Sequence, residues 1–313
     1  MQRSFIILIA AFVIPSVTAA EPKKYALLIG VNKYEHAEMN KPELQFAEAD
    51  VTDLAELLKS SGYEVDLLVG PKASREAVAA KIKGLAGKGN ADGVVLVGLA
   101  GHGVQFEKDD DAFYCPYDTT VRRAVRDGKP VLDTNGKQII EPDPKSLVRL
   151  TDIVKEFELS KAGVRVLLAD CCRNDPTTGR GRGVGSGIKT SQLPGNTAIL
   201  LSCSHGQQAW EHKKWGHGAF FYHVLQGLRD GKGTVVSLSA YLEENVAKDV
   251  KSLYNAPDQD PHPLINGKRL DFGLVAGKKE PKPGEERVFD VGNGVKMTFC
   301  WIPGTNGKAT LGS

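Results

Sequence analysis

Two apolar runs, each followed at once by reactive polar residues, decide the fold. They are Val94-Val-Leu-Val-Gly-Leu99, which precedes Ala100-Gly-His-Gly103, and Val164-Arg-Val-Leu-Leu-Ala169, which precedes Asp170-Cys-Cys-Arg-Asn174. Short runs of this kind predict strands buried in a parallel sheet. Ligands of such sheets bind beyond the carboxyl ends of the strands. If these two strands are neighbours, His102 and a cysteine would therefore lie close together.

Strand-like and helix-like patterns alternate around these two runs. Further strands are expected at residues 25–31, 63–69, 197–202 and 263–265, and helices at 44–62, from Ser74 onward, and at 218–228 and 237–253. This alternation predicts an α/β fold with a mainly parallel sheet of about six strands, flanked by helices. Arg122 to Arg149 reads as an irregular inserted loop, and Thr177 to Gly195 as a basic, glycine-rich loop.

Composition excludes several classes of protein. The chain has 313 residues, 41% of them hydrophobic, and a formal net charge of +2. These values are typical of a globular protein and leave no net field that would attract nucleic acid. The five cysteines are an odd number, and Cys171 and Cys172 are adjacent, so a disulfide framework does not organise the fold.

The two ends of the chain differ from the middle. Residues 1–20, with Arg3, an apolar run from Phe5 to Ile14 and small residues before Glu21, match a secretory signal peptide. We expect export to the periplasm or the extracellular space and no membrane contact after signal removal; an uncleaved anchor is the alternative. Residues 273–287 read as a linker, and 288–313 as the incomplete start of another domain.

A histidine and a cysteine at neighbouring strand ends suit a thiolate nucleophile paired with an imidazole acid–base. The amides of Gly103 and of the cysteine would then stabilise the developing oxyanion. Each residue alone has a plainer interpretation: a histidine in a Gly-His-Gly turn is often structural, and a lone cysteine is often a small buried apolar residue. Metal-ligand spacings are absent from the histidines and cysteines, so no metal is expected.

Four motifs in order resemble the caspase-like cysteine peptidases, particularly the bacterial members near metacaspases. They are the opening strand Tyr25–Tyr34, Ala100-Gly-His-Gly103, Asp170-Cys-Cys-Arg-Asn174, and Leu201–Glu211 followed by Gly218–Tyr222. The resemblance covers residues 23–272 and implies a peptidase domain over 21–272 with the caspase-like three-layer fold. His102 and Cys172 are separated by 70 residues, a gap that the 122–149 insertion explains.

The resemblance also assigns roles to individual residues. Cys172 is implied as the nucleophile, with Cys171 in a small buried position. Asp170 matches an aspartate that faces the first specificity pocket of metacaspases, where a carboxylate would select arginine or lysine. A turn or cap role is the alternative for Asp170. Glu211 and Ser202 are further candidates for substrate binding.

Several features limit or extend this assignment. His205 stands where many metacaspases carry a second pocket aspartate, which weakens the expectation of strict basic specificity. Calcium activation, known in several metacaspases, is left open and no cofactor is expected. Arg180, Arg182 and Lys189 follow the nucleophile in a basic loop and are candidate self-cleavage sites.

The tail has a resemblance of its own. Asn293 to Thr305, with Leu311-Gly-Ser313, resembles the start of a formylglycine-generating-enzyme or sulfatase-modifying domain. The sequence thus predicts an exported caspase-like cysteine endopeptidase that acts on protein or peptide substrates after basic residues. The alternatives are a non-catalytic interaction module, or a regulatory domain whose main activity lies in the missing C-terminal domain. Oligomeric state is open.

Overall fold

The computed structural model describes residues 21–106, 111–171, 188–204, 206–254, 258–275, 286–290 and 296–300. The expected signal peptide, Cys172, Arg180, Arg182 and His205 lie outside these residues. Within the described ranges, no helix combines the length and apolar character that crossing a membrane requires.

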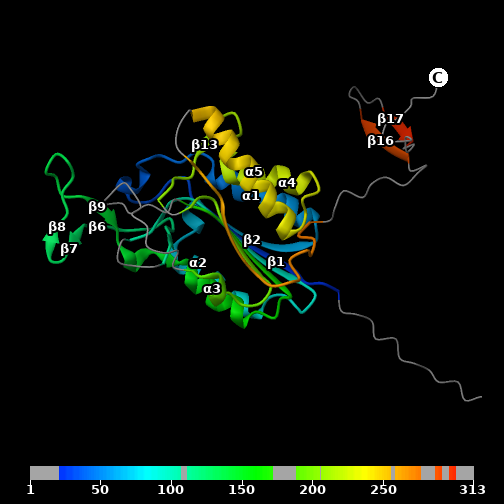
Figure 1. Cartoon of the computed structure of the whole chain (residues 1–313), viewed down its shortest axis with the longest axis horizontal. Helices are drawn as coiled ribbons and strands as arrows, with labels where there is room; N and C mark the ends of the chain where they lie inside the picture. Colours follow the sequence, from blue (N-terminus) through cyan, green and yellow to red (C-terminus); the bar gives the residue numbers. More distant parts are fainter. Residues whose placement is uncertain are drawn as a thin grey trace, which may run out of the picture.

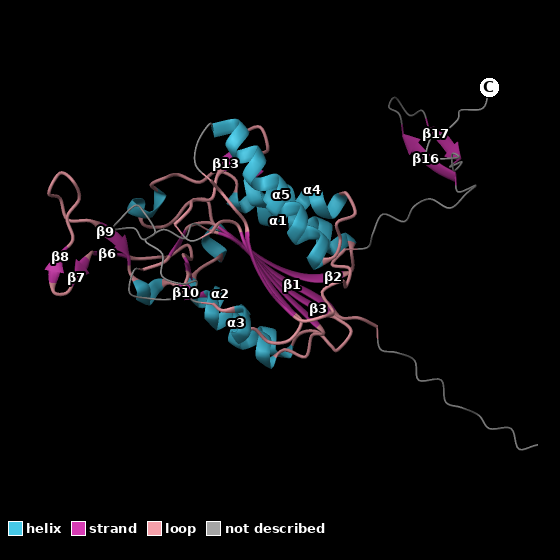
Figure 2. Ribbon diagram, viewed as in Figure 1, coloured by secondary structure: helices cyan, strands magenta, loops and turns pink. Residues whose placement is uncertain are grey.

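A six-stranded sheet with the order β15-β12-β11-β3-β1-β2 forms the centre of the molecule (Figure 2). Its strands are β1 (Lys24–Gly30), β2 (Tyr63–Val69), β3 (Val94–Ala100), β11 (Val164–Asp170), β12 (Thr197–Leu201) and β15 (His262–Asn266). All neighbours are parallel except β15, which runs antiparallel to β12. Every residue of β3 is buried, as its continuous apolar sequence predicts. The expected α/β class and strand number are confirmed.

Helices cover both faces of this sheet (Figure 1). On one face lie α1 (Ala47–Ser60), α4 (Ala219–Arg229) and α5 (Val235–Tyr254), and on the other α2 (Arg75–Lys83) and α3 (Leu150–Leu159). The stripe Val51, Leu54 and Leu58 places α1 against the sheet, since all three side chains are fully buried. Ser74 caps α2 as expected, with its Oγ accepting from the Ala77 amide at 3.3 Å.

Short elements connect these layers. A three-stranded sheet joins β4 (Gly103–Val104), β5 (Phe113–Tyr114) and β10 (Val148–Arg149), while β13 (Glu211–His212) pairs with β14 (His217–Gly218). Single 3-10 turns occupy Ala37–Asn40, Gly70–Lys72, Gly84–Gly87, Pro144–Ser146 and Thr190–Gln192. The last turn falls in the predicted basic loop, where Lys189 is exposed.

The prediction that residues 122–149 form an irregular loop is wrong in one respect, because half of the segment is in short strands and a 3-10 turn. Residues 121–142 form what we call the arm, with β6 (Val121–Arg123) paired to β9 (Ile140–Pro142), and β7 (Val125–Arg126) paired to β8 (Lys129–Pro130). Figure 1 shows this hairpin structure extending away from the central sheet. Strands of two or three residues are too short to show the alternation by which strands are recognised.

The packed core continues slightly past the domain end that the sequence suggests. Leu274 and Val275 are buried, and the Leu274 amide donates to the Gly233 carbonyl at 2.6 Å. In the tail, β16 (Glu286–Asp290) pairs antiparallel with β17 (Lys296–Cys300).

Candidate active site

The register of β3 and β11 sets the centre of the site. Ala100 is the partner of Asp170, and the Gly101 amide donates to the Asp170 carbonyl at 3.2 Å. His102 and Cys172 therefore each follow a paired strand end by two residues. Cys172 itself lies outside the described residues, whereas Cys171 is buried, in keeping with the small inward position implied for it. The two strands are neighbours, which is the condition under which the sequence places His102 close to the cysteine.

The His102 imidazole is held from two sides. Its Nε2 lies 3.1 Å from the Pro42 carbonyl oxygen, and its ring stacks on Tyr34 with centroids 5.1 Å apart and planes at 18°. Because a carbonyl only accepts hydrogen bonds, this contact favours the tautomer with the proton on Nε2. Nδ1 is then the nitrogen able to accept a proton.

Tyr34 also fixes the backbone of the histidine. The His102 amide donates to the Tyr34 hydroxyl at 2.6 Å, and Tyr34 is buried. Gly101 permits this approach, since its φ is +146° and a Cβ there would stand 2.9 Å from the Tyr34 hydroxyl. Burial lowers the pKa of His102, opposed by the Pro42 and Met39 carbonyls, so the neutral ring is favoured.

Gly103 presents its amide away from the neighbouring strand. The Cys115 amide donates to the His102 carbonyl at 3.0 Å, which makes the next pair, Gly103 and Tyr114, a non-hydrogen-bonded pair of the antiparallel ladder. In such a pair the amides face outward from the ladder. This orientation agrees with the oxyanion role expected for Gly103.

A pocket of about 620 Å³ brings His102 together with Asp170 and Glu211. Asp170 is 7% exposed, and its Oδ1 makes no hydrogen bond to any residue that the structure describes. Burial raises the pKa of Asp170 to about 8, with further contributions from the charges of Asp50 and Glu211. Ser202 Oγ is likewise buried without a hydrogen bond of normal geometry to the described residues, and its hydroxyl offsets only part of this shift.

Asp50, on α1, is a pocket residue that the sequence reasoning missed. It is 2% exposed, accepts from the Gly218 amide at 3.2 Å, and lies 2.8 Å from Nδ1 of His217. Burial raises its pKa to about 6, opposed by His217 and the Gly218 amide. A Cβ on Gly218 would stand 2.7 Å from Asp170 Oδ2 and 3.1 Å from Asp50 Oδ2, so the two carboxylates flank one glycine. A charged residue within the apolar stripe of α1 was the available signal.

Glu211 reaches the pocket from β13. Its carboxylate accepts from the Gln45 amide at 2.8 Å and the Phe46 amide at 3.2 Å, just before α1 begins. Burial raises the pKa of Glu211, and these two amides oppose the shift. Glu211 therefore both lines the pocket and ties β13 to the start of α1.

Comparison with known proteins agrees with this arrangement. The central six-stranded sheet with a helical layer on each face is the caspase class of fold. The sequence matches the caspase domain family over residues 23–281, and the chain belongs to that family.

Solved structures show the same fold at low identity. Caspase-1 from Spodoptera frugiperda is 14% identical with a TM-score of 0.57, over 82% of this chain and 92% of that one. A structural-genomics protein from Geobacter sulfurreducens is 17% identical with a TM-score of 0.55, over 82% of this chain and 98% of that one. No curated protein matches the sequence.

Proposed function

We propose that the chain is a cysteine endopeptidase that uses Cys172 and His102. The observation that carries this proposal is the geometry of His102, whose Nε2 is engaged by the Pro42 carbonyl and whose strand end is paired with the strand that leads to Cys172. A neutral imidazole held in this way is suited to act as a base at Nδ1.

The proposed reaction follows from this arrangement. His102 Nδ1 takes the proton of the Cys172 thiol, and the sulfur attacks the peptide carbonyl carbon. The amides of Gly103 and Cys172 would hold the resulting oxyanion. The imidazolium then gives its proton to the leaving amine as the C–N bond breaks. Water, deprotonated by the same ring, hydrolyses the thioester and restores the thiol.

We further propose that the acidic pocket selects arginine or lysine. Asp170 and Asp50 are both buried beside Gly218, and Glu211 lines the same pocket. Among the described residues Asp170 Oδ1 has no hydrogen-bond partner, so it could receive a charge-assisted hydrogen bond from a guanidinium or ammonium group. Ser202 would assist as a neutral partner at the same end.

Fluorogenic peptides that end in arginine, lysine or aspartate test both proposals. We expect hydrolysis after the basic residues, abolished by Cys172→Ala and retained by the adjacent Cys171→Ala control. Turnover that survives Cys172→Ala would refute the mechanism, and a preference for aspartate would refute the pocket assignment. Assays with calcium and with a chelator decide the metal requirement. No turnover under either condition would favour a non-catalytic module or a regulatory domain of a larger protein.

Self-processing is a related proposal. Arg180, Arg182 and Lys189 follow Cys172 in the sequence, and Lys189 is exposed. The acidic pocket has the charge that would accept such residues. N-terminal sequencing of the purified wild-type chain beside Cys172→Ala tests this, because equal fragmentation in both would exclude self-cleavage.

Export and the identity of the tail are also proposals. We propose that residues 1–20 direct secretion, which mass spectrometry of the mature chain from culture would check by a start near Glu21. Residues 288–313 are proposed as the beginning of a formylglycine-generating-enzyme-like domain, supported by the motif Asn293 to Thr305.

A further inference from the structure

The arm, residues 121–142, is internally ordered. The Ala124 amide donates to the Ile139 carbonyl at 2.8 Å, the Val131 amide donates to the Ala124 carbonyl at 3.1 Å, and Ala124 is fully buried. Asp127 and Gly128 have φ values of 51° and 75°, as the two-residue turn between β7 and β8 requires. The arm therefore has a defined shape of its own.

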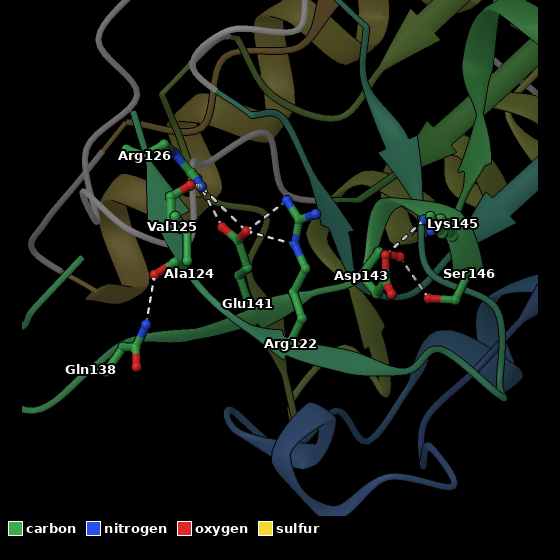
Figure 3. A network of polar contacts seen from close by, with 9 residues as sticks. All are labelled: Arg122, Ala124, Val125, Arg126, Gln138, Glu141, Asp143, Lys145 and Ser146. Carbon is green, nitrogen blue, oxygen red and sulfur yellow. Dashed lines mark hydrogen bonds and ion pairs between the residues drawn. The ribbon is translucent and has the colours of Figure 1, made fainter. Parts of the chain in front are cut away.

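A buried carboxylate, Glu141, is paired with two partly exposed arginines at the base of the arm (Figure 3). The Glu141 side chain is fully buried, Arg122 Nε donates to its Oε1 at 2.9 Å, and Arg126 donates to its Oε2 at 2.8 Å. Burying a carboxylate is costly unless it is paired in good geometry, and such networks hold one arrangement against others. Glu141 joins β9 to β6 and β7, so it sets the position of its neighbour Ile140.

One end of the arm contributes apolar side chains to the lining of the active-site pocket. The exposed large apolar side chains that the structure describes include three on the arm, namely Val125, Leu132 and Ile140. Only Ile140 among these three lines the pocket that contains His102, together with Val121 and Pro142. Ile140 is 45% exposed, compared with 48% for Val125. The pocket thus has an acidic end and an apolar wall.

We infer that the arm is a second substrate-recognition element, in which Ile140, Val121 and Pro142 receive an apolar side chain that flanks the basic residue of the peptide. This inference rests on the proposed peptidase function. A pocket of about 620 Å³ falls within the range of about 300–1,000 Å³ typical of sites that enclose a ligand larger than one side chain. A peptide advances by about 3.3–3.6 Å per residue, so a neighbour of the basic residue stays within reach of the same pocket.

The chemistry of the arm's pocket wall determines which kind of side chain it would bind. The Glu141 carboxylate, which also lines the pocket, is paired with Arg122 and Arg126, so the contact that Ile140, Val121 and Pro142 offer to a ligand is apolar. An apolar contact in a partly open site discriminates by about tenfold, the lower end of the range for hydrophobic pockets. The flanking position is accordingly expected to favour leucine over serine by that factor.

Binding to the full chain carrying Cys172→Ala provides the test, because no turnover is needed. Labelled arginine peptides flanked by leucine or by serine, on either side of the arginine, are compared by fluorescence anisotropy. We expect about tenfold tighter binding of one leucine-flanked peptide. Ile140→Ser should bring this ratio close to one, whereas Val125→Ser, an equally exposed site on the arm outside the pocket, should preserve it.

A second variant tests the positioning role of the ion pair. Glu141→Gln should reduce the leucine-to-serine ratio, since one charge that holds β9 is lost, while Arg126→Lys should partly retain it. Circular dichroism confirms that each variant is folded. The quantity compared is the ratio of affinities for the leucine-flanked and serine-flanked peptides within one variant. A variant that binds both peptides more weakly by the same factor leaves this ratio unchanged.

The outcomes separate the inference from the proposed function. If the serine-flanked arginine peptide neither binds the Cys172→Ala chain nor is cleaved by the wild type, the proposed function and the inference both fail. If it binds but the ratio is one, or the ratio survives Ile140→Ser, the inference alone fails. An equal loss in Val125→Ser also overturns it, because the arm would then act as a general apolar surface for another partner.

Discussion

Replacing Asp170 with asparagine should stabilise the unliganded fold, increasingly so as the pH rises. Asp170 is buried, its Oδ1 makes no hydrogen bond to the described residues, and Asp50 and Glu211 add like charge nearby. Together these raise its pKa from 3.8 to about 8. Asparagine has a similar shape and no charge to bury. Binding sites often retain a destabilising group of this kind because function requires it.

The sign and size of the effect follow from proton linkage. Below pH 3.8 the carboxyl is protonated in both the folded and the unfolded chain, and it contributes nothing. Between pH 3.8 and about 8 the unfolded chain releases this proton while the folded chain keeps it, so the free energy of unfolding falls with pH. At about 1.4 kcal/mol per pH unit, the wild type should lose roughly 4 kcal/mol relative to Asp170→Asn between pH 5 and pH 8.

Urea unfolding of the wild type and of Asp170→Asn at pH 5, 6, 7 and 8 measures how the difference in their free energies of unfolding changes with pH. The control is Asp92→Asn, which makes the same substitution at a side chain that is 55% exposed. An Asp170→Asn difference that is the same at pH 5 and pH 8 would refute the argument, since it would show that the carboxyl ionises normally in the folded state. The same variant should lose affinity for arginine peptides.

Three further substitutions test other contacts of the site. Tyr34→Phe leaves the His102 amide without its acceptor, which should cost about 1–3 kcal/mol in urea unfolding and lower kcat more than it raises KM. Gly218→Ala places a Cβ 2.7 Å from Asp170 Oδ2, so we expect about 1–3 kcal/mol of destabilisation and weaker arginine-peptide binding by anisotropy. Glu211→Gln removes a charge at the start of α1, with an expected loss of about 0.3–1 kcal/mol in thermal unfolding and a higher KM for arginine peptides.

The central sheet was predictable because its strands carry their own pattern. A buried parallel strand is largely apolar along its length. The apolar residues of 94–99 and 164–169 therefore predicted both that these segments are strands and that they are buried. Connection rules for parallel sheets limit the possible strand orders, but they did not decide that these two strands are neighbours. The sequence therefore predicted that His102 follows a strand end, and the pairing of that end with Asp170 comes from the fold.

The arm was not predictable in the same way. Its strands are two or three residues long, and its cohesion comes from contacts between residues far apart along the insertion, such as Arg122 with Glu141. A segment rich in glycine, proline and charged residues predicts a solvated loop, unless it is known which of its charged side chains form ion pairs. Only the fold shows that Glu141 is buried and that Ile140 faces the pocket.

The acidic pocket depends on strand ends and on a helix, and this explains why Asp170 and Glu211 were predicted from the sequence and Asp50 was missed. Asp170 is the last residue of a sheet strand, and this position indicated a role in the site. Asp50 lies on α1, whose sequence otherwise predicts only packing against the core. The link between them is Gly218, whose amide donates to Asp50 and whose lack of a side chain leaves room for Asp170. The two carboxylates therefore share a pocket because α1, β11 and the start of α4 pack around one glycine. Their combined charge is a property of that packing, and it is strongest when a bound cation compensates for their burial.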